Sequence, residues 1–246
     1  MRAHRLILPE AAERERLSLD AVDARHVRVL RLQPGDAVRV CDGAGREWEG
    51  RLEPEGRGWA VVRGGVLRSE VPPRPHVTLF QGWARGDKME WILQKAVELG
   101  VMDFVPLLTT RTPFRPDRDA PRLPRWREIA RQAARQSERT HLARVHPPAT
   151  FAEALAAAET MDAALLPYED ASDADRLHAG GGPPPERLGV FIGPEGGFES
   201  REAAAAAERG VRRIWLGPRI LRTETAGIAM LTLVQYLWGD LGGQAT

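Results

Sequence analysis

The sequence lacks the features that mark several classes of protein. Cys41 is the only cysteine in 246 residues, which excludes an internal disulfide framework and fits a reducing, cytoplasmic setting. The six histidines are scattered without CxxC or HxxxH spacing, so no metal site is expected. No apolar run approaches the roughly 20 residues that span a bilayer, and the charged first residues do not form a signal peptide. We therefore expect a cytoplasmic protein without disulfides, metal or membrane anchor.

Lysine is also scarce, because Lys88 and Lys95 are the only two in the chain. The net charge is +1, yet residues 111–145 hold ten arginines against four acidic residues. One interpretation is a helical segment with a solvated, charged face. The other is a patch that contacts phosphates, since arginine pairs bidentately with phosphate oxygens. Composition alone leaves both interpretations open.

The first 70 residues are predicted to be rich in β-structure. Apolar and polar residues alternate in segments separated by Gly, Asp and Pro turns, at residues 37–43, 46–55 and 58–66. A short helix is expected within 23–36, before a Pro-Gly turn. Short strands with tight turns indicate a small barrel. The proline-rich segment that follows is the expected linker.

From residue 76 onward, apolar strands alternate with amphipathic helices. Strands are predicted at 76–83, 103–109, 162–170, 188–192 and 211–217, and helices at 86–101, 122–139, 151–159, 200–210 and 223–241. This alternation is typical of an α/β domain with a parallel sheet covered on both faces.

Three turns rich in Gly and Pro follow the last three predicted strands: LLPYED, IGPEGGF and LGPRILRTETA. Ligands of open α/β sheets bind outside the carboxyl ends of the strands, so these turns predict a shared ligand site. IGPEGGF matches neither GxGxxG nor the Walker A motif, and its acid Glu195 would repel a phosphate. Backbone groups, apolar walls and an acid suit a neutral or cationic nucleoside such as S-adenosylmethionine. The glycines are interpreted as clearance for that nucleoside.

The pair of motifs VFIGPEGGFESRE and IWLGPRILRTETA resembles the closing motifs of the bacterial 16S ribosomal RNA uridine-N3 methyltransferase family, which belongs to the SPOUT (trefoil-knot) class. Upstream segments agree with this resemblance, at HVRVLRLQPGD, GDKMEWILQKAVELGV and RWREIARQAARQSER. The similarity therefore extends over essentially the whole chain.

The resemblance implies a PUA-like, RNA-binding β-barrel at 1–70, a linker at 71–75, and a knotted SPOUT α/β methyltransferase domain at 76–246. It also implies a homodimer with the final helix in the interface, through an apolar face of Ile228, Leu231, Val234, Leu237 and Trp238. The plainer interpretation of that face is packing within the domain.

The resemblance assigns roles to individual residues. It implies S-adenosylmethionine as the cofactor, held by Leu166, Pro167, Gly193, Pro194, Glu195, Gly196, Gly197, Leu216, Gly217, Ile220, Leu221, Arg222 and Ala226. RNA contacts are expected at Arg25, His26, Arg28, Arg31, Lys88, Gln136 and Arg139. For Lys88, Gln136 and Arg139 the alternative is a solvated surface residue.

Three residues are candidates for catalysis: Arg222, Glu195 and Glu224. Uridine N3 must lose a proton before or during attack on the methyl group, and Arg222 would stabilise the charge that develops on O2 or O4. Glu195 and Glu224 are the carboxylates nearest the site, and positioning is favoured over proton transfer for both. Alternatively, Glu195 is a turn residue, and Glu224 belongs to a helix start capped by Thr223 or Thr225.

The leading hypothesis is thus an S-adenosylmethionine-dependent methyltransferase for N3 of a uridine in 16S ribosomal RNA, acting on the assembled 30S subunit. One alternative is a SPOUT methyltransferase for another RNA, such as transfer RNA. A second alternative is a non-catalytic RNA-binding factor of ribosome assembly.

Overall fold

The structure, a computed structural model, describes residues 4–112, 122–178 and 183–242. Residues 113–121 of the predicted arginine-rich segment lie outside this description. By contacts the chain divides into two compact units, one of residues 1–72 with 134–142 and one of residues 73–133 with 143–246. The predicted boundaries at 70 and 76 did not include the segment 134–142 in the first unit. None of the described helices is long and apolar enough to cross a membrane.

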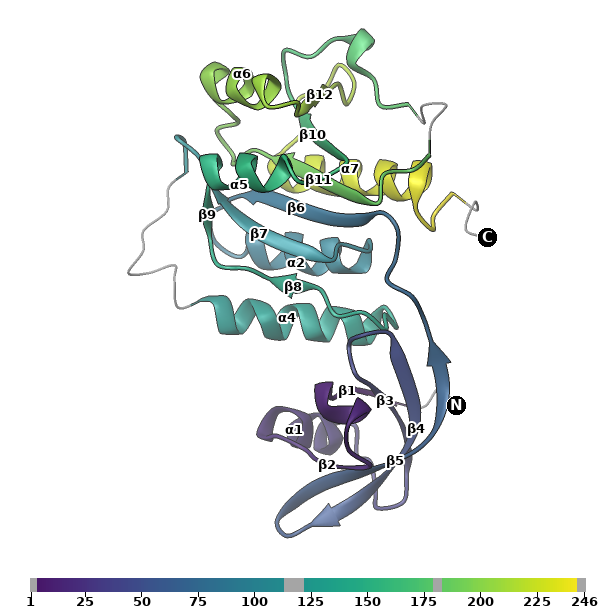
Figure 1. The fold of residues 1–246 in the computed structure, drawn as a ribbon. Helices are drawn as coiled ribbons and strands as arrows, with labels where there is room; N and C mark the ends of the chain where they lie inside the picture. Colours follow the sequence, from purple (N-terminus) through teal and green to yellow (C-terminus); the bar gives the residue numbers. More distant parts are fainter. Residues whose placement is uncertain (1–3, 113–121, 179–182, 243–246) are drawn as a thin grey trace. The chain divides into compact units, whose positions relative to one another are not determined.

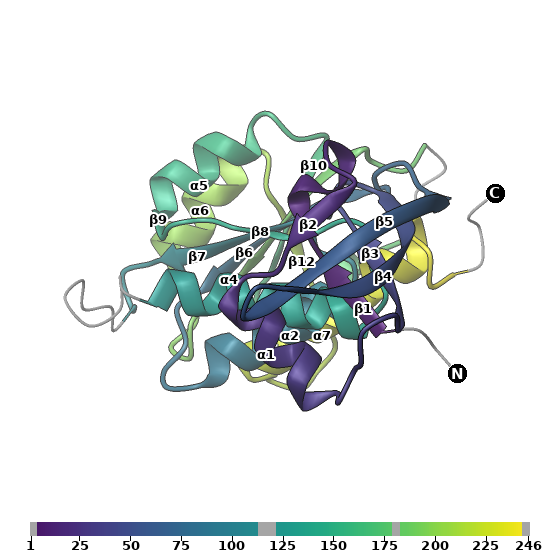
Figure 2. The same cartoon turned by 90° about the horizontal axis from the view of Figure 1, so that it is seen from below.

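The first unit is a five-stranded mixed sheet with one helix (Figure 1, and from below in Figure 2). Its strands run in the order β1-β3-β4-β5-β2, and only the β1–β3 pair is parallel. The strands are β1 (His4–Ile7), β2 (Arg16–Ser18), β3 (Ala37–Cys41), β4 (Arg46–Glu55) and β5 (Gly58–Ser69). The three predicted strands are present, whereas β1 and β2 are too short to show a clear alternation in the sequence.

Helix α1 (Ala21–Val29) packs on this sheet through Val27, which is fully buried with Val40, Trp48 and Leu52. The helix begins after Asp20, whose carboxylate accepts a hydrogen bond from the Asp23 N–H at 2.8 Å. A 3₁₀ turn, η1 (Pro9–Ala12), precedes it.

The second unit is built on a parallel sheet in the order β12-β10-β11-β6-β7-β8, with β9 also paired to β7. Its strands are β6 (His76–Gly82), β7 (Asp103–Leu108), β8 (Arg144–Val145), β9 (Ala149–Thr150), β10 (Ala163–Pro167), β11 (Arg187–Ile192) and β12 (Arg212–Ile214). The helices are α2 (Lys88–Glu98), α4 (Leu123–Gln136), α5 (Phe151–Ala158), α6 (Ser200–Glu208) and α7 (Thr223–Trp238), with a 3₁₀ turn η3 (Asp173–Asp175). The predicted α/β alternation is confirmed.

The two faces of this sheet carry different helices. Phe191 packs with α5 and α6 in one core cluster, and its ring stacks on Phe80 at 4.5 Å. The next residue, Ile192, points to the opposite face because side chains alternate along a strand, and there it approaches Gly227 of α7. Helix α7 also packs along α2. The sheet is therefore covered on both sides, as predicted.

The expected dimer face of α7 is partly wrong. Leu231 and Val234 have no exposed surface and belong to the core of this chain, so they are not available to a partner. The apolar residues that α7 does expose are Leu233 (38%) and Tyr236 (62%). Of the five predicted residues, only Leu231 and Val234 are buried, whereas Ile228, Leu237 and Trp238 are half-buried.

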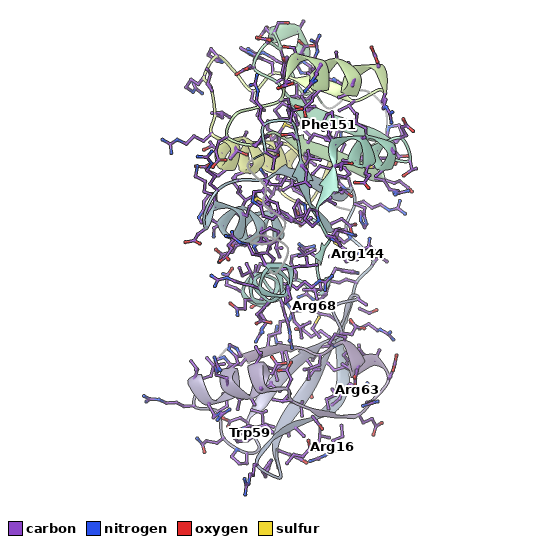
Figure 3. The ribbon with its side chains drawn as sticks, turned by 90° about the vertical axis from the view of Figure 1, so that its left-hand side faces the viewer. Arg16, Trp59, Arg63, Arg68, Arg144 and Phe151 are labelled. Atoms are coloured by element: carbon purple, nitrogen blue, oxygen red, sulfur yellow. The ribbon has the colours of Figure 1, made fainter. Side chains whose placement is uncertain are left out.

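A charged cluster closes the amino end of the sheet. Asp103 accepts two hydrogen bonds from Arg144, which is labelled in Figure 3, at 2.8 Å, one from His146 at 2.5 Å and one from His76. Burial raises the pKa of Asp103, but these donors outweigh it and hold the pKa well below its usual range. The cluster lies at the end of the strands opposite to the predicted ligand site.

Candidate active site

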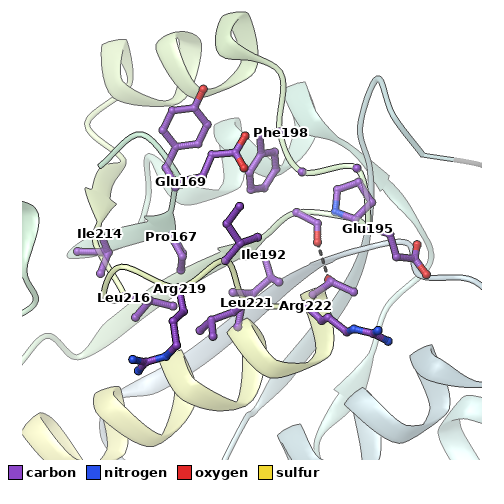
Figure 4. A pocket seen from close by; sticks show the side chains of 18 of the residues that line it. Pro167, Glu169, Ile192, Glu195, Phe198, Ile214, Leu216, Arg219, Leu221 and Arg222 are labelled. Carbon is purple, nitrogen blue, oxygen red and sulfur yellow. Dashed lines mark hydrogen bonds between the residues drawn. The ribbon is translucent and has the colours of Figure 1, made fainter. Parts of the chain in front are cut away.

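A cavity of about 510 Å³ lies at the carboxyl ends of β10, β11 and β12 (Figure 4). Its walls come from the three loops that follow these strands, at 167–169, 192–198 and 214–222, and from the first turns of α2 and α7. This volume falls within the range of about 300–1,000 Å³ that is usual for small-molecule sites. Among the described residues, no group of His, Cys, Asp and Glu is arranged to hold a metal ion.

The predicted cofactor-binding residues line this cavity, with one exception. Leu166 is fully buried in the core with Phe191 and Phe198, one position before the lining residue Pro167. The strand β10 points its side chains alternately, so Leu166 supports the wall from behind. Apolar side chains form the rest of that wall, from Ile192, Phe198, Ile214, Leu216 and Leu221.

The glycines of IGPEGGF have local structural reasons that the sequence interpretation missed. A Cβ at Gly196 would lie 3.3 Å from the Cβ and Cδ of Arg111, whose guanidinium donates to the Gly196 carbonyl at 2.6 Å. Gly197 has φ +69°, the left-handed region that favours glycine. Clearance for Arg111 and a tight turn thus account for these two residues.

A close backbone approach at the site involves a glycine that was not predicted. A Cβ on Gly82, at the end of β6, would lie 2.3 Å from the Pro194 nitrogen and 2.5 Å from the Gly193 carbonyl carbon. The end of β6 therefore contacts the loop Gly193–Gly197, called the cofactor loop below, directly, backbone against backbone. The signal in the sequence was a glycine near the end of the predicted strand 76–83, in QGW.

Charged side chains gather at one end of the cavity. The Lys88 ammonium lies 3.2 Å from Glu195 Oε1 and 3.8 Å from Glu224 Oε2. Glu195 Oε1 also accepts the Arg85 N–H at 3.1 Å. Burial raises the pKa of Glu195, but the Arg85 and Lys88 donors outweigh it and leave the pKa below its ordinary value. Glu195 is thus an ionised carboxylate that holds Lys88 and the segment before α2.

Arg222 lies at this same end, while Ile214 and Leu216 lie at the other (Figure 4). Arg222 is exposed, and among the described residues its guanidinium makes no hydrogen bond or ion pair. The predicted catalytic arginine is therefore free to contact a substrate. The exposed Arg219, which the sequence interpretation did not single out, also lines the cavity.

The start of α7 differs from the expected capped helix. Arg222 occupies the N-cap position, and no side chain caps the helix. The Thr223 hydroxyl donates to the Gly193 carbonyl instead of capping the helix, and Thr225 is exposed. Glu224 does lie in the first turn, where a carboxylate interacts favourably with the helix dipole. Its Oε2 is buried and has no hydrogen-bond partner among the described residues apart from the ion pair with Lys88.

The predicted RNA contacts fall into two groups. Lys88 lines the cavity in the second unit. The other six belong to the first unit, on α1 and at the end of α4. Arg25, Arg28 and Arg31 are exposed there, and Arg31 has φ +56° just after α1.

Two arginines on the neighbouring strands β2 and β5 of the first unit already contact other side chains. Arg16 on β2 pairs with Glu53 and Glu55, and Arg63 on β5 lies over the Trp48 ring at 5.0 Å (Figure 3). These two arginines therefore already have partners within the first unit.

Comparisons with known proteins agree with this architecture. The RNA methyltransferase domain model matches residues 72–235, and the RNA methyltransferase PUA domain model matches residues 19–63. The ribosomal RNA small subunit methyltransferase E of Synechocystis sp. is 35% identical over 240 residues, covering 96% of this chain and 78% of the relative.

Solved structures give the same result. The small subunit methyltransferase E of Neisseria gonorrhoeae, bound to S-adenosyl methionine, superposes with a TM-score of 0.82 at 32% identity and covers 98% of this chain and 100% of its own. A Legionella pneumophila protein described as a methyltransferase, solved with bound SAM, gives a TM-score of 0.88 at 28% identity, with the same coverage.

The fold and the cavity thus define an RNA methyltransferase with an N-terminal PUA domain. More specifically, the chain belongs to the ribosomal RNA small subunit methyltransferase E family.

Proposed function

We propose that the protein transfers a methyl group from S-adenosylmethionine to N3 of a uridine in 16S ribosomal RNA, in the assembled small subunit. The observation that carries this proposal is the cavity at the carboxyl ends of β10–β12, which combines apolar walls with a charged end. Family membership supplies the RNA substrate class.

The residues present fit the cofactor. An adenosine group needs a space bounded by apolar side chains and backbone polar groups, and the cavity offers Ile192, Leu216 and Leu221 beside the Gly193–Gly197 loop. A sulfonium group is cationic, and the carboxylates of Glu169 and Glu195 border the cavity. S-adenosylmethionine, when bound, supplies an electrophilic methyl group on its sulfonium sulfur.

The residues at the charged end would act on the uracil. In the reaction the N3–CH₃ bond forms, the S–CH₃ bond breaks, and the N3 proton leaves to solvent or to a base. Negative charge develops on O2 and O4, and Arg222 is placed to stabilise it. Lys88 adds a second positive charge, fixed by Glu195 and Glu224. We assign Glu195 a positioning role, because a carboxylate with a lowered pKa is a weak proton acceptor.

The remaining elements of the proposal concern the partners. The first unit would bind RNA phosphates through Arg25, Arg28 and Arg31, contacts that position RNA without reading its sequence. Because the substrate is a ribosomal subunit, the protein would act in the cytoplasm. The trefoil knot is part of this proposal, and the hydrogen bond from Thr223 to Gly193 supports a last helix that begins beneath the cofactor loop.

A homodimer through α7 is also proposed. The exposed Leu233 and Tyr236 replace the buried Leu231 and Val234 as the expected contacts, and Trp91 on α2 is exposed as well (46%). Equilibrium sedimentation of wild type and Tyr236→Glu tests this element by itself.

The function is tested by methyl transfer to 30S subunits that lack the modification, with the product nucleoside identified by mass spectrometry. We expect 3-methyluridine in 16S RNA, and no transfer to subunits that already carry it. Product at another position or in transfer RNA would keep the class and overturn the specificity. Binding of S-adenosylhomocysteine, measured by calorimetry, separates the enzyme from a non-catalytic RNA-binding factor, which would not bind it.

A further inference from the structure

A buried chain of hydrogen bonds links three segments that are far apart in the sequence. Gln81 at the end of β6 is fully buried, and its Nε2 donates to Thr223 Oγ1 at 2.9 Å. The Thr223 hydroxyl donates in turn to the Gly193 carbonyl at 2.5 Å. Thr223 is the first residue of α7, and Gly193 begins the cofactor loop.

The direction of this chain follows from its end points. A carbonyl oxygen only accepts, so Thr223 must use its single hydrogen on Gly193 and its lone pair on Gln81. The second Nε2 hydrogen of Gln81 goes to the Gly82 carbonyl at 3.1 Å, which fixes the orientation of the amide. Each hydrogen of the Gln81 amide therefore has one acceptor.

An ordinary role in starting the helix does not explain Thr223. The N-cap of α7 is Arg222, and no side chain caps this helix, so the Thr223 hydroxyl serves the cofactor loop instead of α7. Thr223 is only 6% exposed, which makes its hydrogen bonds costly to lose.

The chain of hydrogen bonds from Gln81 through Thr223 to Gly193 sets the spacing of the two halves of the site. On one side is the Gly193 carbonyl, which accepts the hydrogen bond of the first residue of α7. On the other side are Arg222 and Glu224, the neighbours of Thr223 in sequence, at the charged end. A shift at Thr223 would move Arg222 relative to the loop that faces the cofactor.

We propose that Gln81 and Thr223 are positioning residues, which hold the cofactor loop and the Arg222 end of the site in register for methyl transfer. This role rests on the proposed function. Neither residue would touch the reacting atoms, and both would act through Gly193 and Arg222.

Thr223→Val tests the role because it keeps the shape of the side chain and removes the hydroxyl. Thr225→Val is the matched control, since Thr225 is an exposed threonine in the same turn of α7. We expect Thr223→Val to lower kcat on 30S subunits by about tenfold or more, with a smaller loss of S-adenosylhomocysteine affinity. Thr223→Ser should recover most of the rate, and Thr225→Val should match wild type.

The possible outcomes separate the two proposals. A wild type that binds no S-adenosylhomocysteine and methylates no RNA overturns the proposed function, and with it the positioning role. An active wild type with Thr223→Val as fast as Thr225→Val overturns the positioning role alone. A Thr223→Ser as slow as Thr223→Val does the same, because the hydroxyl would not be the operative group. If Thr223→Val does not fold, Thr223→Ser and Gln81→Met, compared at temperatures where both are folded, give the same test.

Discussion

The close contact between Gly82 and the cofactor loop makes a quantitative test of how that loop is held. In Gly82→Ala the new Cβ would lie 2.3 Å from the Pro194 nitrogen, whereas carbon contacts in proteins essentially never fall below 3.0 Å and are ordinary from 3.4 Å. The two backbones must therefore separate by 0.7 to 1.1 Å, the differences between these contact limits and 2.3 Å. Both segments are backbone, so no flexible side chain can absorb the shift.

Such a displacement should weaken both the fold and the binding of the cofactor. Overpacking of a well-packed interior costs about 1–3 kcal/mol, and we expect the free energy of unfolding to fall by this amount. The displaced segment, Gly193–Pro194, lines the cavity, so S-adenosylhomocysteine affinity should fall by about tenfold or more. Gly196→Ala should cause a loss of about threefold at most, because its Cβ meets only the exposed side chain of Arg111 at 3.3 Å.

Calorimetric titration with S-adenosylhomocysteine measures the affinities, and thermal unfolding measures the stability of the same samples. Gly65→Ala provides the baseline, since no atom lies within 4 Å of its added Cβ and its backbone is not left-handed. Wild-type affinity in Gly82→Ala would refute the support assigned to β6. A larger loss in Gly196→Ala than in Gly82→Ala would instead restore the interpretation of Gly196 as clearance for the nucleoside.

Three further predictions concern single side chains. Arg222→Ala should lower kcat by about 100-fold with little change in S-adenosylhomocysteine affinity, and an equal loss in both would make Arg222 a binding residue. Asp103→Asn should destabilise the fold by about 2 kcal/mol at neutral pH, because three basic side chains lose a charged acceptor and one of its two oxygens is replaced by an NH₂ donor, although the exposure of Arg144 moderates the loss. The pKa of Asp103 is depressed below its ordinary value of 3.8, so Asp103 stabilises the fold above that pH and this stabilisation is lost as the pH falls below it. The difference in unfolding free energy between wild type and Asp103→Asn should therefore shrink on acidification. A difference that grows on acidification would contradict the assignment. Cys41 is fully buried, its thiol donates to the Thr140 carbonyl at 3.3 Å, and burial raises the pKa of the thiol. A thiol reagent should therefore react with Cys41 only after the protein unfolds. Rapid reaction of the native protein would contradict this burial.

The elements of the fold were largely predictable, because their signals are local. The alternation in 46–55 and the helical spacing in 86–101 produced β4 and α2 close to their predicted bounds. Strands of two to four residues, such as β2 and β8, gave no such signal. They form because neighbouring strands offer unpaired backbone groups, which is information from tertiary structure.

The residues that line the cavity were also largely predictable, whereas the contacts among them were not. The motifs placed Gly193, Glu195 and Arg222 together because all three follow strands of one parallel sheet. Nothing in the motifs showed that Glu195 is occupied by Arg85 and Lys88, or that Thr223 hydrogen-bonds to the loop. Those contacts join residues about 30 to 110 positions apart, and they depend on side-chain orientation that sequence spacing does not determine.

The two ends of the cavity are held by different kinds of contact, and this has a consequence for how mutations should act. The cofactor loop is held through its own backbone. Gly82 packs against the Pro194 nitrogen, and the side chains of Arg111 and Thr223 donate to the carbonyls of Gly196 and Gly193. The charged end is fixed by ion pairs of partly exposed side chains, which are weak individually and leave Arg222 free. A rigid loop favours tight binding of one molecule in one geometry, and free charges at the open end can adapt to an RNA that arrives afterwards. Changes to the loop should therefore reduce affinity for the cofactor first, whereas changes to the charged end should reduce the rate of transfer first. Thr223 connects both ends, because it bonds to the cofactor loop and precedes Glu224 in the chain. Substitution of Thr223 should therefore reduce both cofactor affinity and the rate of transfer, and it should reduce the rate more.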